Sequence, residues 1–236
     1  IEGKYEDTSV GTPQGGLTSP ILANVYLHYV LDLWFEKCIK KQLYGKAYLI
    51  RFADDFLIMF QYERDAQRVY EAVIKRMELF GLELSKEKTR ILPFGRNSVS
   101  RETFDFLGFT HFNSKTRKGY YSVGHKISRK KKKQFKSNLK KWVKENRNTQ
   151  FDEFMKALNK KLTGSFNYYS LSGMIREIKC LWYHSLFVTF KWLNRRSQRR
   201  SFKMERFCEI WNARIIRPYI HVDIWSGDKV IYNKNV

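Results

Sequence analysis

The sequence predicts an α+β chain, in which a small antiparallel sheet with helices is followed by an all-α helical bundle. Two observations predict this class. Over about the first 110 residues, apolar residues at helical spacing alternate with short runs of β-forming residues. From about residue 126 onward, the apolar residues recur at helical spacing alone. The 236 residues suffice for one large domain or for two small ones with their own cores.

The first elements are a loop and a helix. Residues 11–20 are dense in Gly and Pro, which favours a loop. The apolar side chains of 21–34 fall on one helical face. Thr18 or Ser19 can cap this helix, with Pro20 in its first turn.

A hairpin, a second helix and short strands follow. Alternating β-forming residues predict a hairpin over about 47–61. An amphipathic pattern predicts a helix over 65–80, which Gly81 ends. The other strand candidates are 82–84, 90–92 and 104–109.

The second half contains three apolar stripes at helical spacing, each with basic residues on the remaining surface. They cover 126–145, 151–166 and 174–193, and Gly164 and Gly173 separate the last two. Three such helices predict a small bundle. The stripes form its core and carry no assigned function.

Charge is distributed unevenly along the chain. Residues 1–114 carry 15 basic and 15 acidic side chains, whereas residues 115–217 carry 28 and 6. Residues 218–236 form a balanced tail. A positive excess confined to one segment indicates a module that binds a polyanion, joined to a neutral module. Nucleic acid is favoured over an acidic membrane as that partner.

Cysteine usage and hydropathy exclude several classes. Cys38, Cys180 and Cys208 are far apart and form no CxxC pair, so we expect a reducing compartment and no structural zinc. No apolar run approaches the roughly 18 residues that a membrane span needs, and the beginning of the chain lacks a signal-peptide pattern.

Two adjacent carboxylates stand out in the predicted hairpin. Asp54 and Asp55 lie within an apolar stretch, and the strand pattern places them with Ala53 at the hairpin tip. Carboxylates buried there would need a partner, and two of like charge repel each other. A divalent cation would neutralise both, as in two-metal phosphoryl transfer. An ordinary polar turn is the alternative.

Six segments of the chain, in order, resemble blocks of the reverse transcriptases and maturases that group II introns encode. The first four resemble the polymerase palm, including the Phe-Ala-Asp-Asp box, and the last two resemble the thumb and maturase region. The resemblance implies a partial palm over 1–114, a basic thumb/maturase region over 115–217 and a tail over 218–236. The six segments are 11–24, 52–55, 81–89, 106–109, 164–169 and 193–201.

The resemblance implies a catalytic centre. Asp54 and Asp55 would bind two Mg²⁺ ions, Asp54 more strongly, and Lys88 would protonate the leaving pyrophosphate. The implied nucleotide-binding residues are Gln14, Gly15, Gly16, Phe52 and Ala53. The implied primer-support residues are Leu107, Gly108 and Phe109. For the glycine-containing loop, the alternative is a plain turn. For Lys88 it is a solvated lysine, and for the primer-support residues it is a strand that enters the core.

The chain departs from the family pattern at two places. Phe52 replaces a usual Tyr, which removes a hydroxyl near the nucleotide. The third metal-binding Asp of the family lies before the loop, where only ten residues precede Gly11 and Asp7 has no apolar strand around it. We therefore expect a C-terminal part of a longer protein, with little polymerisation by this polypeptide alone.

The resemblance also implies that the basic region binds nucleic acid. Cations along a helix would contact phosphates and release counterions, and arginines would bind phosphates bidentately. The implied partners are an RNA template with a DNA primer, deoxynucleoside triphosphates and structured group II intron RNA, whose splicing the region would assist. The candidate residues are Arg129, Lys130, Lys131, Lys132, Lys133, Lys136, Lys140, Lys141, Arg195, Arg196, Arg199 and Arg200.

Competing interpretations remain open. A non-catalytic RNA-binding splicing factor derived from a reverse transcriptase is the main alternative, followed by a basic RNA-associated protein without activity and by other reverse transcriptase lineages. No Cys/His cluster follows Arg217, so target-DNA cleavage is not expected. A cytoplasmic, bacterial-type setting without a membrane partner fits these features.

Overall fold

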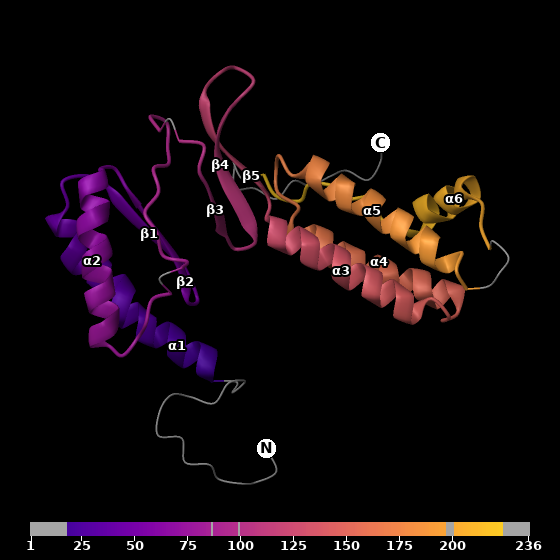
Figure 1. Ribbon diagram of the computed structural model, residues 1–236, viewed down its shortest axis with the longest axis horizontal. Helices are drawn as coiled ribbons and strands as arrows, with labels where there is room; N and C mark the ends of the chain where they lie inside the picture. The colour runs from indigo at the N-terminus through magenta and orange to yellow at the C-terminus, as the bar shows by residue number, and fades with distance from the viewer. Residues whose placement is uncertain (1–17, 86, 99, 197–200, 224–236) are drawn as a thin grey trace, which may run out of the picture. The chain divides into compact units, whose positions relative to one another are not determined.

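The computed structural model describes residues 18–223, apart from 86, 99 and 197–200, and divides into two compact units that meet between Phe94 and Gly95 (Figure 1). The chain mixes helices with small antiparallel sheets, as the sequence predicts. Residues 95–114 carry two basic and two acidic side chains, so charge alone does not locate this division. Within the described ranges, no helix is long and apolar enough to cross a bilayer.

The first unit begins with one long, irregular helical segment. Helix α1 (Ser19–Leu27) continues into two π-helical stretches, η1 (His28–Asp32) and η2 (Phe35–Ile39), and a short 3₁₀ turn, η3 (Lys40–Gln42). Thr18 occupies the N-cap position without a side-chain cap bond. The predicted helix is confirmed. Its apolar face is buried only from Val30 onward, while α1 itself has no buried residue.

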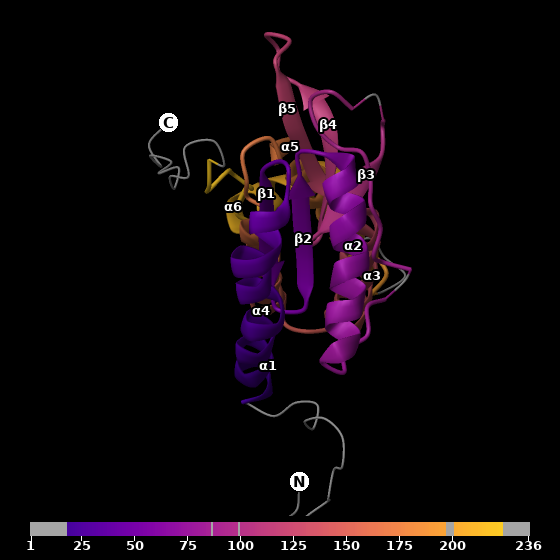
Figure 2. The ribbon, with the colours of Figure 1, turned by 90° about the vertical axis from the view of Figure 1, so that its left-hand side faces the viewer.

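The predicted hairpin follows. Strands β1 (Ala47–Phe52) and β2 (Asp55–Phe60) pair antiparallel, with Phe52 opposite Asp55, so Ala53 and Asp54 form the tip. Figure 2 shows this hairpin between α1 and α2 (Glu63–Leu79). One sheet face packs on α2 and on the η1 and η2 stretches, because seven buried residues from these elements and β1 form one core: Val30, Leu31, Phe35, Ala47, Val69, Val73 and Met77.

Helix α2 ends as its sequence predicts. Gly81 has a φ of +68°, and the Leu82 amide donates to the Met77 carbonyl at 2.9 Å, which closes the last turn. The predicted strands 82–84 and 90–92 are wrong, since neither segment forms a strand in the described part of the chain. A segment of three residues without a neighbouring strand makes no hydrogen-bonded ladder.

The second unit begins with a three-stranded antiparallel sheet. Its strands are β3 (Thr103–Phe106), β4 (Phe109–Lys115) and β5 (Tyr121–Ile127), in that order. The single strand predicted over 104–109 is wrong, because Leu107 and Gly108 form a two-residue turn between two strands. Both have positive φ, +50° and +82°. Such values suit a two-residue hairpin loop, but Leu107 gave no sequence signal for one.

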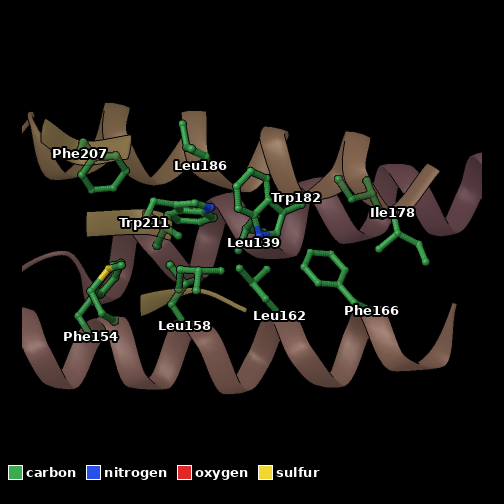
Figure 3. Close-up of a cluster of buried hydrophobic side chains, with 14 of the residues drawn as sticks. Leu139, Phe154, Leu158, Leu162, Phe166, Ile178, Trp182, Leu186, Phe207 and Trp211 are labelled. Carbon is green, nitrogen blue, oxygen red and sulfur yellow. The ribbon is translucent and has the colours of Figure 1, made fainter. Parts of the chain in front are cut away.

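Four helices complete the second unit. The three predicted helices are α3 (Arg129–Asn146), α4 (Phe151–Tyr168) and α5 (Ile175–Leu193), and α6 (Met204–Arg214) is an addition. Figure 3 shows their apolar side chains converging, with Trp211 of α6 and Trp182 of α5 in the centre. Ile127 of β5 joins this core, so the unit combines sheet and helices and is not all-α.

Candidate functional site

The two carboxylates lie at the exposed tip of the hairpin. Asp54 and Asp55 are both solvent-exposed, so the prediction that they are buried among apolar residues is wrong. The apolar residues around them in sequence belong to strands whose core contacts end before the tip. No desolvation cost therefore demands a cation here, and any affinity for a metal must come from the geometry of the carboxylates and their surroundings.

A single arginine ties the tip to the helical segment behind it. The Arg51 guanidinium donates to both carboxylate oxygens of Asp32, at 2.8 and 2.7 Å. Its remaining terminal nitrogen donates to the Asn24 side-chain oxygen and to the Ala53 carbonyl, both at 2.9 Å. Because Ala53 is the tip residue next to Asp54, this network fixes where the carboxylates emerge.

Electrostatics reinforce this anchor. The hydrogen bond from Arg51 lowers the pKa of Asp32, against a smaller opposing effect of burial. The same bond raises the pKa of Arg51. Both groups therefore stay ionised at neutral pH, and the fork-like pair is partly shielded from water, with Arg51 12% exposed.

The tip carries a strained residue. Ala53 has a φ of +53°, a left-handed conformation that non-glycine residues seldom adopt. Such strain is retained where surrounding contacts hold it, and the Arg51 bond to the Ala53 carbonyl is one such contact. Strain of this kind is frequent at functional turns.

The hairpin face that turns away from the helices is apolar and exposed. Tyr48, Ile50 and Phe52 are 54%, 45% and 63% exposed. Phe52 lies opposite Asp55 in the ladder, so both side chains project from this face. The face thus presents aromatic and aliphatic surface with a carboxylate at its end, next to the tip.

The other predicted residues of the catalytic centre are placed only in part. Lys88 is exposed in a turn whose amides at Lys88 and Thr89 bond the Ser85 carbonyl at 3.1 and 2.9 Å. The predicted nucleotide-binding loop residues Gln14, Gly15 and Gly16 lie outside the described residues. Of the predicted nucleotide-binding residues, the structure therefore places Phe52 and Ala53 next to the two predicted metal-binding carboxylates.

The predicted primer-support residues form the β3–β4 turn, and this turn docks on two helices. Ser128, the N-cap of α3, donates its amide to the Gly108 carbonyl at 3.0 Å. At the end of α4, the Tyr168 hydroxyl donates to the Leu107 carbonyl at 2.9 Å, and its ring stacks on Phe109. The turn is thereby held rigidly within its unit.

Most of the predicted nucleic-acid-binding side chains are solvent-exposed. On α3, Lys132 is the half-buried exception and pairs with Glu177 of α5 at 2.5 Å. After α5, Arg195 is exposed and Arg196 is half-buried, while Arg199 and Arg200 lie outside the described residues. The exposed members on α3 are Arg129, Lys130, Lys131, Lys133, Lys136, Lys140 and Lys141.

Metal binding by the hairpin would rest on two carboxylates. No cluster of three or more Asp, Glu, His or Cys side chains suited to a metal occurs among the described residues. Carboxylate oxygens are ligands that Mg²⁺ prefers, and it commonly uses one or two of them together with waters and substrate phosphates. The exposed pair fits such an open site better than an all-protein cage.

Sequence reasoning missed the residues that support the tip. Asp32 and Asn24 come from the helical segment, and Arg51 lies on the inward side of β1, where alternation predicts an apolar residue. A charged residue at an inward position of the strand was the one sequence signal that could have pointed to this anchor. Asp65 was also missed: it is 2% exposed and accepts the amides of Tyr44 and Gly45, which fixes the loop before β1.

Comparison with protein-family models relates the first part of the chain to a known family. Residues 2–111 match the family model described as reverse transcriptase (RNA-dependent DNA polymerase). The match spans just under half of the chain and includes the hairpin tip, Lys88 and the β3–β4 turn. A search of curated proteins found no match.

Proposed function

We propose that this chain is part of an RNA-directed DNA polymerase of the group II intron type, which also binds intron RNA and assists its splicing. The reverse transcriptase match over 2–111 supports the polymerase class. The observation that carries the proposal is the hairpin tip, where adjacent carboxylates project beside an exposed aromatic face and are anchored from behind by Arg51. The six ordered segments support the intron type.

In this proposal Asp54 and Asp55 hold two Mg²⁺ ions, with a third acidic ligand that the described residues do not supply. Bound there, the ions would supply Lewis-acid activation of the primer hydroxyl and charge neutralisation at the phosphates. Arg51 keeps the tip in place and is already satisfied by Asp32, so it adds no free positive charge to the centre. Phe52 offers its exposed ring to the sugar of the incoming nucleotide.

The remaining predicted residues take the other roles in nucleotide addition. By the resemblance, Gln14, Gly15 and Gly16 would line the nucleotide and the templating base, and glycines permit a close approach because they lack a Cβ. Lys88, exposed in its turn, donates a proton to the departing pyrophosphate. The Leu107–Gly108–Phe109 turn supports the primer terminus, for which its fixed docking on α3 and α4 is well suited.

Replacing one carboxylate tests the proposal. In the full-length protein, Asp54→Ala should abolish complementary-DNA synthesis on an RNA template, because the stronger metal ligand is lost. Splicing assistance and RNA affinity should persist, because the basic surface is unchanged. If Asp54→Ala leaves DNA synthesis intact, the polymerase assignment is wrong.

A non-catalytic RNA-binding splicing factor is the second candidate. The solvent exposure of both carboxylates favours this second candidate, because an exposed polar turn is stable without a bound metal. The two candidates differ in one measurement. A non-catalytic factor shows no DNA synthesis even in the full-length protein, and Asp54→Ala then changes nothing.

A further inference from the structure

Three positive side chains surround one tryptophan at the end of the helical bundle. Trp192 lies in the last turn of α5. Lys144 Nζ lies 5.9 Å from the centre of its ring, and the guanidinium carbons of Arg147 and Arg195 lie 5.5 and 5.4 Å away. Lys144 and Arg147 come from the end of α3, so the C-terminal ends of α3 and α5 meet here.

These charges lie close together without acidic partners. Each is within 6 Å of one point, so any two are less than 12 Å apart. None of the three makes an ion pair with a described residue. Glu145, on the adjacent position of α3, is exposed and likewise makes none. Their mutual repulsion is only partly screened at physiological salt, where the Debye length is about 8 Å.

The fold holds the charges in place. Two helix C-termini favour cations, and the ring attracts each cation weakly through its π face. The Asn194 side chain accepts the Phe202 amide at 2.8 Å and donates to the Phe202 carbonyl at 3.1 Å, which fixes the chain on either side of the arginine-rich segment. The site is therefore built from two helix ends, and the Asn194–Phe202 bonds hold the end of α5.

Arg196, the residue after Arg195, is a fourth cation of this segment. The Nε and one terminal nitrogen of Arg196 are buried and have no hydrogen-bond partner among the described residues. Burial lowers the pKa of Arg196. A buried guanidinium without an acceptor is costly, and a bound anion would remove that cost.

We propose that Lys144, Arg147, Trp192 and Arg195 form a binding site for phosphates of an RNA strand, separate from the carboxylate hairpin. Guanidinium groups bind phosphate oxygens bidentately, and their planes and an aromatic ring accept unpaired bases. The net charge of the chain, +22, favours an extended polyanion over a single small anion. The inference rests on the RNA-binding part of the proposed function and not on its polymerase part.

The test compares two triple substitutions of equal charge in the whole chain. Lys144→Ala/Arg147→Ala/Arg195→Ala removes the cluster. The matched control, Lys156→Ala/Lys160→Ala/Lys179→Ala, removes three exposed lysines of the same bundle that contact no ring. Binding of a structured RNA with single-stranded loops is measured by filter retention across a salt series, without nucleotides or primer, and circular dichroism checks folding.

We expect the cluster variant to bind about tenfold or more weakly at 0.15 M salt, with its salt slope reduced by about two to three, since each lost phosphate contact removes roughly 0.7 to 0.9. The control should change little. A charge-preserving pair, Arg147→Lys/Arg195→Lys, should keep the salt slope and lose a few-fold in affinity, because lysine has no bidentate fork.

Equal losses in the cluster and control variants would show a bulk charge effect and overturn the site. An unchanged cluster variant would overturn it too, while leaving the proposed polymerase untouched. If the parent chain binds no RNA at all, both the site and the RNA-binding part of the proposed function fail. Asp54→Ala should leave this binding unaltered, which separates the two sites.

Discussion

At the scale of single residues, the hairpin tip depends on Arg51. The Arg51 guanidinium joins Asp32, Asn24 and the Ala53 carbonyl. It therefore fixes the position of Asp54 and Asp55 through the backbone of Ala53. Lysine carries the same charge but lacks the planar fork that makes these bonds at once.

Arg51→Lys should therefore loosen the tip. We expect a loss of about 1.5–3 kcal/mol in the stability of the hairpin, the range for hydrogen bonds to charged groups. Amide hydrogen exchange over residues 47–60 measures it. Arg68→Lys is the control, because Arg68 is exposed and makes only long contacts, of 3.4 and 3.5 Å, with Gln42. Equal exchange in both variants would contradict the anchoring role.

The same pair predicts a response to acid. The pKa of Asp32 in the folded chain is lowered by Arg51, below its unfolded value of about 3.9. Its stabilising contribution is therefore complete above about pH 5 and is lost as the pH falls through the folded pKa. The protection factors of the hairpin amides, which correct for the intrinsic pH dependence of exchange, should fall below about pH 4, and Asp32→Asn should remove that part of the pH dependence. A wild-type profile that stays flat to pH 3 would refute it.

At the scale of elements, the β3–β4 turn is held by contacts that secondary structure alone does not supply. The Tyr168 hydroxyl bonds the Leu107 carbonyl, and Ser128 at the start of α3 bonds the Gly108 carbonyl. Two helices thus fix a two-residue turn with positive φ at both positions.

Tyr168→Phe removes one of these bonds while keeping the ring on Phe109. We expect a loss of about 0.5–1 kcal/mol, at the low end for a hydrogen bond because Tyr168 is 57% exposed. Thermal unfolding measures it. Tyr183→Phe serves as the control, since Tyr183 is 54% exposed and its hydroxyl has no hydrogen bond with a described residue. If Tyr183→Phe lowers stability as much as Tyr168→Phe does, the hydrogen bond to the Leu107 carbonyl does not explain the loss.

Two glycines of this unit should respond in opposite directions to alanine. Gly108→Ala should destabilise the fold by about 1–2 kcal/mol, because a φ of +82° is strained for a residue with a Cβ. The new Cβ itself would meet its neighbours at ordinary van der Waals distances. Gly164→Ala, inside α4 with no atom within 4 Å of the new Cβ, should stabilise it by about 0.5–1 kcal/mol. Chemical denaturation of both variants checks the signs, and a shared sign would contradict the backbone argument.

At the scale of the whole molecule, the positive charge is concentrated in one of the two structural units. Residues 1–94 carry 13 basic and 13 acidic side chains, so the entire excess of +22 belongs to the second unit. That unit balances self-repulsion with a core of large apolar residues, including Phe207 and Trp211, which are both fully buried. Such a unit is expected to be stabilised by anything that screens or neutralises its charge.

Salt should therefore stabilise the second unit more than the first. Raising sodium chloride from about 0.05 to 0.5 M shortens the Debye length several-fold and should raise the Tm of the second unit in calorimetry. RNA should have the same effect at low salt, because a ligand that binds only the folded state stabilises it. A Tm of the second unit that falls or stays constant with salt would show that its positive side chains are already compensated within the fold.

Sequence patterns by themselves determined the α+β class, the hairpin, the end of α2 at Gly81 and the three long helices, whereas the pairing of Asp55 with Phe52 narrows the predicted Ala53-Asp54-Asp55 tip to Ala53 and Asp54. Periodicity and turn residues act locally, so they are readable without the fold. The split of 104–109 at Leu107 escaped them, because a leucine with positive φ is tolerated only where Tyr168 and Ser128 hold its turn.

Tertiary structure alone decided the exposure of the two carboxylates, the Arg51 anchor, the placement of α6 and the gathering of Lys144, Arg147 and Arg195 around Trp192. The Arg51 anchor, the placement of α6 and the Trp192 cluster each depend on contacts between distant parts of the sequence, and solvent exposure depends on where the core ends. Neighbours along the chain predict which element forms, but only packing decides which side chains meet.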